Sequence, residues 1–162
     1  MDHLELRILA DELNADTAVA LAAEREAAAR LNDHQRVSDE SCAFHLTRLY
    51  NVVEQMALRI AKAFENNVDD EKGWHIGLIR RLSIRIEGVR PALFPAELRQ
   101  PLHELRSFRH VFVHAYDLEL DPEKLALVLK YARQIAEPLP KLIAAFVQEV
   151  AREQSIELGP LP

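Results

Sequence analysis

Apolar residues recur along much of this chain at intervals of three and four, the spacing that places them on one side of an α-helix. The clearest stretch runs from about residue 38 to about residue 66, and its apolar residues are Phe44, Leu46, Leu49, Val52, Val53, Met56, Ile60 and Phe64. It opens with Ser38-Asp39-Glu40, a capping residue followed by two acids, which favours a helix N-terminus. We therefore predict a long helix here, with this whole side buried.

The same pattern predicts helices on both flanks. Residues 3–31 form one of them, since the alanine-rich run 18–29 has high helix propensity. Another is predicted over about 71–89, where one stripe carries Trp74, Leu78, Leu82 and Ile86. The next element is predicted over about 96–114, with a buried side made of Leu102, Leu105, Phe108 and Phe112.

Prolines divide the second half of the chain. Pro91 and Pro95 separate the two elements just described, and at Pro101 either a helix starts or a short turn has come first. A last helix is predicted from Asp121-Pro122, a cap and a first-position proline, to about Glu153. Two further prolines, at 138 and 140, should kink or split it, and residues 155–162 should be a frayed tail.

Composition agrees with one all-α domain over residues 1–162, an antiparallel bundle of four to five helices. Hydrophobic residues make up 49% of the chain and only 4 residues are glycine. The lone Cys42 cannot form an internal disulfide, which indicates a reducing compartment, the cytoplasm, and we expect it to be a small buried side chain. No apolar run reaches the roughly 18 residues of a membrane span, so no membrane partner is expected.

Charge is distributed unevenly. The net charge of −6 argues on its own against a nucleic-acid partner. Residues 72–110 nevertheless hold three acidic residues against eight basic ones, which are Lys72, Arg80, Arg81, Arg85, Arg90, Arg99, Arg106 and Arg109. A local basic stripe of this kind can attract phosphate; the alternative is that these arginines only decorate solvated helix faces.

Familiar catalytic and cofactor motifs are missing from the sequence. There is no glycine-rich phosphate loop and no Gly-x-Ser-x-Gly, and a single cysteine excludes a thiolate zinc cluster. Glu71 and His75 lie one turn apart, but no second pair accompanies them, as a carboxylate-bridged metal bundle would need. We therefore expect no metal and no cofactor.

One short motif remains: Arg109, His114 and Tyr116, spaced as Arg-x4-His-x-Tyr. The chain has 15 Arg and 7 His. Chance alone then gives an Arg-x4-His pair roughly 0.65 times, and the pair with its tyrosine roughly 0.01 times. Histidine can exchange protons near neutral pH, and arginine can hold two phosphate oxygens at once. This pair suits metal-free RNA cleavage, in which a ribose 2′-hydroxyl attacks its neighbouring phosphate.

The spacing of the pair raises a geometric question. Five residues on a regular helix are separated by roughly 140° around the axis, so Arg109 and His114 would not share a side. Two solutions are open: the helix unwinds before His114, or Arg109 reaches the His114 of a second chain.

The motif and its surroundings resemble the HEPN superfamily, and most closely the HepT-like ribonuclease toxins of HEPN/MNT toxin–antitoxin pairs. Their signature is R-x4-6-H, often followed by x-Tyr, at the end of a helix in an all-α bundle. Residues 50–54 (YNVVE) and 60–66 (IAKAFEN) resemble the second helix of that family, and residues 105–110 (LRSFRH) resemble the approach to its active site. The likeness spans about residues 38–147.

The resemblance implies a homodimeric, metal-independent ribonuclease whose two motifs share one cleft, with Arg109 and His114 as catalytic residues. It also implies a nucleotidyltransferase antitoxin, which in some members attaches AMP to the motif tyrosine, here Tyr116. Arg106 and His110, one turn from the catalytic positions, are candidate RNA-binding residues. Glu54 is a candidate for orienting Arg109 across the bundle.

Plainer roles are open for the same residues. His114 could be a histidine at a helix C-terminus, favoured by the helix dipole, and Tyr116 could be a packing residue. Arg106 and His110 could be solvated charges. For the whole protein, the alternatives are a non-catalytic HEPN-type bundle that binds a nucleotide or a partner protein, and a purely structural helical dimer.

Overall fold

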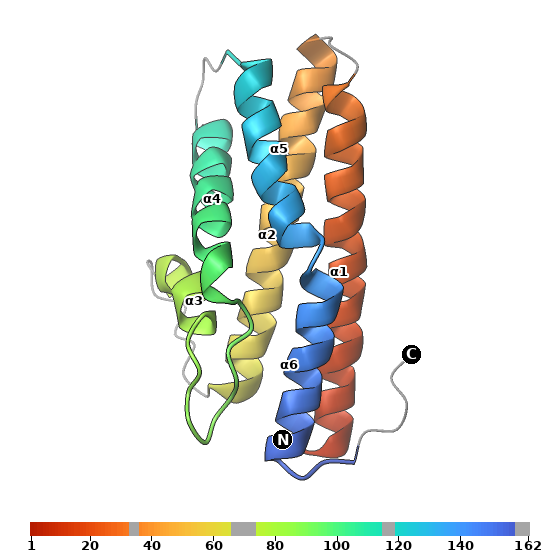
Figure 1. Cartoon of the computed structure of the whole chain (residues 1–162), viewed down its shortest axis with the longest axis vertical. Coiled ribbons are helices and arrows are strands. Elements are labelled where there is room, and N and C mark those ends of the chain that lie inside the picture. The colour runs from red at the N-terminus through yellow and green to blue at the C-terminus, as the bar shows by residue number, and fades with distance from the viewer. Residues whose placement is uncertain (33–35, 66–73, 115–118, 158–162) are drawn as a thin grey trace.

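Antiparallel helices pack side by side along the whole length of the molecule (Figure 1). The computed structural model describes residues 1–32, 36–65, 74–114 and 119–157. The helices are α1 (His3–Leu31), α2 (Arg36–Phe64), α3 (Trp74–Leu82), α4 (Arg99–His114), α5 (Pro122–Ala136) and α6 (Leu139–Glu153). In Figure 1, α5 and α6 follow one another down the same side of α1. The predicted all-α antiparallel bundle is confirmed.

The pairing of α1 with α2 is the longest contact in the bundle. Asp2 caps α1, because its carboxylate accepts from the Glu5 backbone nitrogen at 2.8 Å while the Glu5 carboxylate accepts from the Asp2 nitrogen at 2.8 Å. One buried side of α1 repeats every seven residues and consists of Leu6, Leu13, Ala20 and Ala27, each fully buried. The small side chains at the later positions let α2 approach closely along that half of α1.

The buried side of α2 is almost the predicted one. Leu46, Leu49, Val53, Met56 and Ile60 are fully buried. The prediction is wrong at Phe44, which is 56% exposed. Phe44 precedes the exposed Asn51 by seven residues, two helical turns, so the two share an outer side of α2.

The predicted helix over 71–89 is wrong at its C-terminal end, since α3 stops at Leu82. The backbone nitrogens of Leu93 and Phe94 both donate to the Leu82 carbonyl, at 2.8 and 3.2 Å, and thus occupy the end of the helix. Gly88 then adopts a φ of 72°, which a glycine tolerates and most residues do not. Residues 71–73 lie outside the described residues.

A fully buried arginine holds this connection in place. Arg90 donates to Glu65 through Nε (3.1 Å) and a terminal nitrogen (2.8 Å). Its terminal nitrogens also donate to the backbone carbonyls of Arg81, Ile84 and Pro91 at 3.2 to 3.3 Å. A buried guanidinium needs such a complete set of acceptors, so Arg90 fixes the path of the chain between α3 and α4.

The proline predictions and the predicted Asp121 cap are confirmed, whereas the predicted cap at Ser38 is wrong, because α2 already begins at Arg36. A short 3-10 turn, Ala96–Leu98, precedes α4, so Pro101 lies in the first turns of a helix that has already begun. Asp121 caps α5 by accepting from the Glu123 nitrogen at 2.9 Å, with Pro122 directly after it. The last predicted helix is split at Pro138 into α5 and α6. After α6, Ile156 packs against the core; residues 158–162 lie outside the described residues.

Cys42 is fully buried in α2, as predicted. Burial, with a smaller contribution from Asp39, raises the pKa of its thiol to about 11. The thiol therefore stays protonated and unreactive near neutral pH. As for membranes, none of the described helices combines the length and the apolar character needed to cross one.

Candidate active site

Arg109 is held by α2. Its Nε donates to the Asn51 side-chain oxygen at 3.1 Å, which orients the guanidinium across the gap between α4 and α2. The side chain is half-buried. Its two terminal amino groups have no hydrogen-bond partner among the described residues. Arg109 thus presents a fixed pair of donors to an anion, the geometry that binds two phosphate oxygens.

His114 lies in the last turn of α4, and one hydrogen bond selects the tautomer of its neutral ring. Its Nδ1 is 2.9 Å from the backbone carbonyl of His110. A carbonyl can only accept, so Nδ1 carries the proton and Nε2 of the neutral ring holds the free lone pair. The His110 and His114 rings also face one another, with centroids 4.6 Å apart. His114 is exposed, so its Nε2 is available as a base.

The two motif residues do not meet within one chain. α4 stays helical through His114, so the unwinding considered above does not occur. Arg109 is turned to α2 and His114 lies roughly 140° further around α4. Of the two solutions left open by the sequence, the unwound helix is therefore excluded.

A hollow of about 450 Å³ lies beside Arg109, and its lining is Glu54, His103, Arg106, Ser107, Arg109 and His110. The structure therefore brings together four of the predicted site residues: Arg106, Arg109, His110 and Glu54. His114 is outside this lining and adjoins it through His110. Tyr116 lies outside the described residues.

Glu54 is tied to a buried tyrosine beneath the hollow. The hydroxyl of the fully buried Tyr50 donates to a Glu54 carboxylate oxygen at a long 3.5 Å. Burial raises the pKa of Tyr50 to about 12; Glu54 adds to the rise, and the nearby Arg106 and Arg109 oppose it. Tyr50 is therefore a neutral donor that holds Glu54 at the edge of the hollow.

Three residues of this site, Asn51, His103 and Ser107, were not predicted from the sequence. Asn51, the partner of Arg109, lies one turn before Glu54 on α2, so helical spacing from Glu54 could have indicated it. His103 lies seven residues before His110, two turns earlier on the same side of α4. The resulting row along α4 is His103, Arg106, His110 and His114, at intervals of three and four.

The predicted basic stripe is divided in the structure. Arg81 and Arg90 both pair with Glu65, while Arg85 pairs with Glu87, Glu149 and Glu153. Within this stripe, the arginines that pair with no carboxylate of the described residues are Arg80, Arg99, Arg106 and Arg109. Lys72 lies outside the described residues. The positive potential available to a ligand therefore comes mainly from α4 and the end of α3.

No group of three or more His, Cys, Asp or Glu side chains in the described ranges could hold a metal ion. The chemistry that the described side chains offer consists of proton transfer by an exposed imidazole and anion binding by guanidinium groups.

Comparison with known proteins gives one match. Residues 41–150 match the sequence profile of a family described as HepT-like protein. This range runs from early in α2 to the end of α6 and contains the whole motif. Searches of curated proteins and of solved structures found no match.

Proposed function

The chain belongs to the HepT-like protein family, and on that premise we propose that it is a metal-independent endoribonuclease, the toxin of a toxin–antitoxin pair. The observation that carries the proposal is the Arg109–His114 motif inside the matched range, with one residue prepared to bind an anion and the other to accept a proton. RNA is a substrate that offers both an anion for Arg109 and a proton for His114 to accept, because its phosphate lies next to a 2′-hydroxyl nucleophile.

The proposed reaction is an internal displacement at phosphorus. His114 Nε2 takes the proton of a ribose 2′-hydroxyl, and the 2′-oxygen forms a bond to the adjacent phosphorus. The terminal nitrogens of Arg109 bind the non-bridging oxygens, where negative charge increases. The bond from phosphorus to the 5′-oxygen breaks and that oxygen takes a proton from solvent. The products are a 2′,3′-cyclic phosphate and a free 5′-hydroxyl.

A homodimer is part of this proposal. Because Arg109 and His114 of one chain point apart on a regular α4, a complete site needs a second copy. Exposed apolar side chains flank the Arg109–Asn51 contact and support this. Phe44, on the Asn51 side of α2, is 56% exposed, and Val113, one turn beyond Arg109, is 56% exposed. A second copy that covers them would bring its own His114 to this cleft.

Mixing two inactive variants tests the shared site. If Arg109 of one chain works with His114 of the other, a mixture of Arg109→Ala and His114→Ala chains, unfolded and refolded together, regains part of the activity, because one site of each mixed dimer is intact. Refolding each variant alone is the control. A site confined to one chain would give no recovery, and a monomer by light scattering would contradict the proposal directly.

The activity itself is tested with purified protein and a labelled RNA. His114→Ala should lower the cleavage rate by a factor of about 10² to 10⁴, the usual contribution of a general base. The control is His3→Ala, an exposed histidine on α1 that should leave cleavage unchanged. EDTA should not inhibit. Loss of cleavage on chelation, or an active His114→Ala protein, would reject the mechanism.

Neutralisation by a nucleotidyltransferase partner is proposed to act on Tyr116. AMP attached there would add negative charge and bulk two residues beyond His114, repelling RNA from the site. Co-expression with a nucleotidyltransferase encoded by an adjacent gene, followed by intact-mass measurement, should show added AMP in the wild type and none in Tyr116→Phe. Tyr116→Phe should stay an active nuclease that escapes neutralisation. An unmodified but fully inhibited protein would show instead that the partner acts by binding alone.

A further inference from the structure

A second hollow adjoins the candidate active site. It has a volume of about 380 Å³ and its lining is Ile79, Arg80, Ser83, Arg99, His103 and Arg106. His103 and Arg106 belong to both hollows, so the two are continuous along α4. The second hollow lies where α3 meets the first turns of α4.

The charge of this second hollow is one-sided. Among the described residues, its lining holds three arginines and a histidine, and no carboxylate. Arg80 and Arg99 are exposed, and neither they nor Arg106 pairs with an acid among the described residues. Most arginines elsewhere in the described chain do have such a partner, for example Arg59 with Asp16 at 2.9 Å and Arg133 with Glu24 at 2.8 Å. Three unpaired guanidinium groups around one hollow repel each other, a cost that a bound anion would remove.

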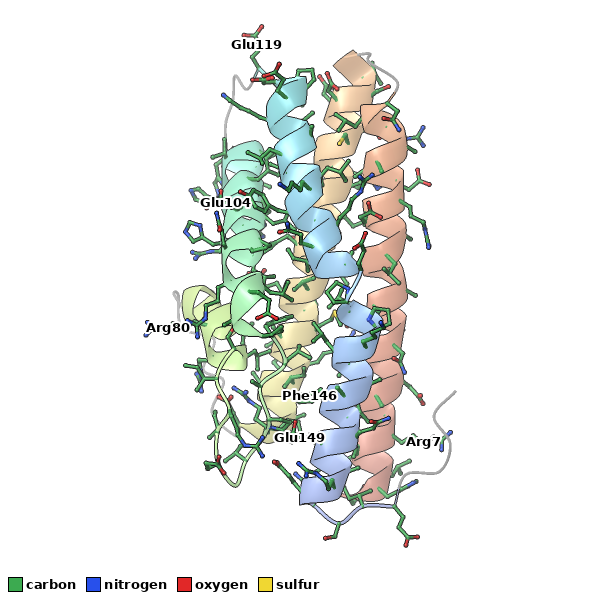
Figure 2. All side chains as sticks on the ribbon, viewed as in Figure 1. Arg7, Arg80, Glu104, Glu119, Phe146 and Glu149 are labelled. Carbon is green, nitrogen blue, oxygen red and sulfur yellow. The ribbon has the colours of Figure 1, made fainter. Side chains whose placement is uncertain are left out.

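The basic side chains are also aligned. Arg99, His103, Arg106, His110 and His114 recur at intervals of four, three, four and four, which keeps them on one side of α4. At a rise of 1.5 Å per residue this row is roughly 22 Å long, enough for several nucleotides of an extended strand. Arg80 faces the start of the row from α3, and Figure 2 shows it at the outer edge of that helix.

We propose that the second hollow is a binding site for backbone phosphates of a single RNA strand, beyond the nucleotides that are cut. Arg80 and Arg99 bind the phosphates, and His103 and Arg106 connect this site to the catalytic one. The inference rests on the proposed ribonuclease function, because it identifies the anion as the continuation of the same strand. Guanidinium contacts to phosphate do not distinguish one base from another. This site therefore increases the affinity for longer RNA strands and does not favour a particular sequence.

The test compares RNA length on a protein that cannot cut. In the His114→Ala background, fluorescence anisotropy measures the affinity for labelled oligouridines of about four and about twelve nucleotides. The double substitution Arg80→Gln/Arg99→Gln should weaken binding of the longer RNA about tenfold and leave the shorter one unchanged. Losing two phosphate contacts should also reduce the slope of log affinity against log salt by about 1.4.

A matched control separates a local site from overall charge. Arg7→Gln/Arg25→Gln removes the same charge from two exposed arginines of α1, and Arg7 lies on the other side of the bundle in Figure 2. This control should bind both RNAs like the parent protein. Equal weakening by both double variants, or equal weakening of both RNA lengths, would overturn the proposal. The proposal would also be overturned if the Arg80→Gln/Arg99→Gln variant kept its RNA affinity but lost a co-purifying protein partner.

The outcome is independent of the catalytic proposal. If the wild type cuts RNA and the Arg80/Arg99 variant binds the longer strand normally, only the second site is wrong. If the wild type does not cut RNA but the length-dependent loss is observed, the second site stands as an RNA-binding site and the ribonuclease proposal fails. In an active protein, Arg80→Gln/Arg99→Gln should raise KM for a long substrate and leave kcat unchanged.

Discussion

The arginines between residues 80 and 109 form two groups that differ in what faces them. The tied arginines lie in the last turn of α3 and in the connection that follows it; they are Arg81, Arg85 and Arg90, each bound to carboxylates. The open arginines are Arg80, Arg99, Arg106 and Arg109, which have no carboxylate partner within the described residues. Both groups come from one basic stretch of sequence, yet only the open ones can receive an anion from outside.

The comparison of the two groups shows that the number of basic residues in a sequence segment overestimates how many of them can bind an anion. A guanidinium paired with a carboxylate has little net potential and few free donors, so a phosphate would first have to displace the acid. Apart from Glu87, the carboxylates that tie Arg81, Arg85 and Arg90 lie directly after α2 or in α6, between 16 and 68 residues away in sequence. The tied group therefore fixes the α3–α4 connection, and the guanidinium groups of the open arginines remain accessible to an anion.

The largest effect is expected from a tied arginine. Arg90→Met leaves one oxygen of Glu65 and three backbone carbonyls without their Arg90 donors, and Arg81 pairs only with the other Glu65 oxygen, so the free energy of unfolding should fall by about 3–5 kcal/mol. Urea unfolding followed by circular dichroism measures this. Arg80→Met, an exposed and open position, should stay within about 0.5 kcal/mol of the wild type. If the two substitutions cost the same, the division into tied and open arginines is wrong.

The next effect is on catalysis and arises from an open arginine. Arg109→Lys keeps the positive charge but replaces a fork of two donors by a point charge, and it cannot reproduce the Nε bond to Asn51. Cleavage should fall about 100-fold, the loss typical of one donor to a developing oxyanion. The melting temperature should not change. A lysine variant that cleaves normally would show that Arg109 supplies only charge.

Much of the bundle was accessible from the sequence because its signals are local. Helical spacing predicted α1 and α2, and the Asp121 cap and Pro138 predicted how the last helix begins and divides. The α3–α4 connection was not accessible in this way. The helix pattern there continues past Leu82, and what ends the helix is a set of contacts to Leu93, Phe94 and Arg90 that depends on the folded chain.

The same distinction, between local sequence signals and contacts made only in the folded chain, applies to the candidate site. The motif gave Arg109 and His114 from spacing alone, and its neighbours Arg106 and His110 follow from one helical turn. Asn51 contacts Arg109 across two helices that are 58 residues apart in sequence, so no local pattern connects them. Phe44 fits the apolar repeat of α2 but faces outward, and a spacing rule alone cannot tell a buried position from an exposed one.

A smaller effect should follow from turning an open arginine into a tied one. Asn51→Asp keeps an acceptor for the Arg109 Nε but puts a carboxylate beside it, which partly neutralises the guanidinium. We expect cleavage and RNA affinity each to fall about fivefold, close to the 1 kcal/mol that one such interaction contributes. Asn51→Gln is the neutral control. If Asn51→Asp were as active as the wild type, the free charge of Arg109 would not matter for the reaction.

The smallest effect is expected at Arg85, which gives the strictest test of the division into tied and open arginines. Arg85 is exposed and contacts Glu87, Glu149 and Glu153; Glu149, with a smaller contribution from Glu87, raises its pKa. Arg85→Gln and Arg106→Gln remove the same unit of charge. Arg106→Gln should lower the salt slope of RNA binding by about 0.7, as the loss of one phosphate contact requires. Arg85→Gln should leave that slope and the cleavage rate unchanged and lower the melting temperature only slightly, because an exposed ion pair contributes little to stability. If both variants lowered the salt slope of RNA binding equally, RNA would respond only to the total charge of the protein. The carboxylates around Arg85 would then make no difference to RNA binding.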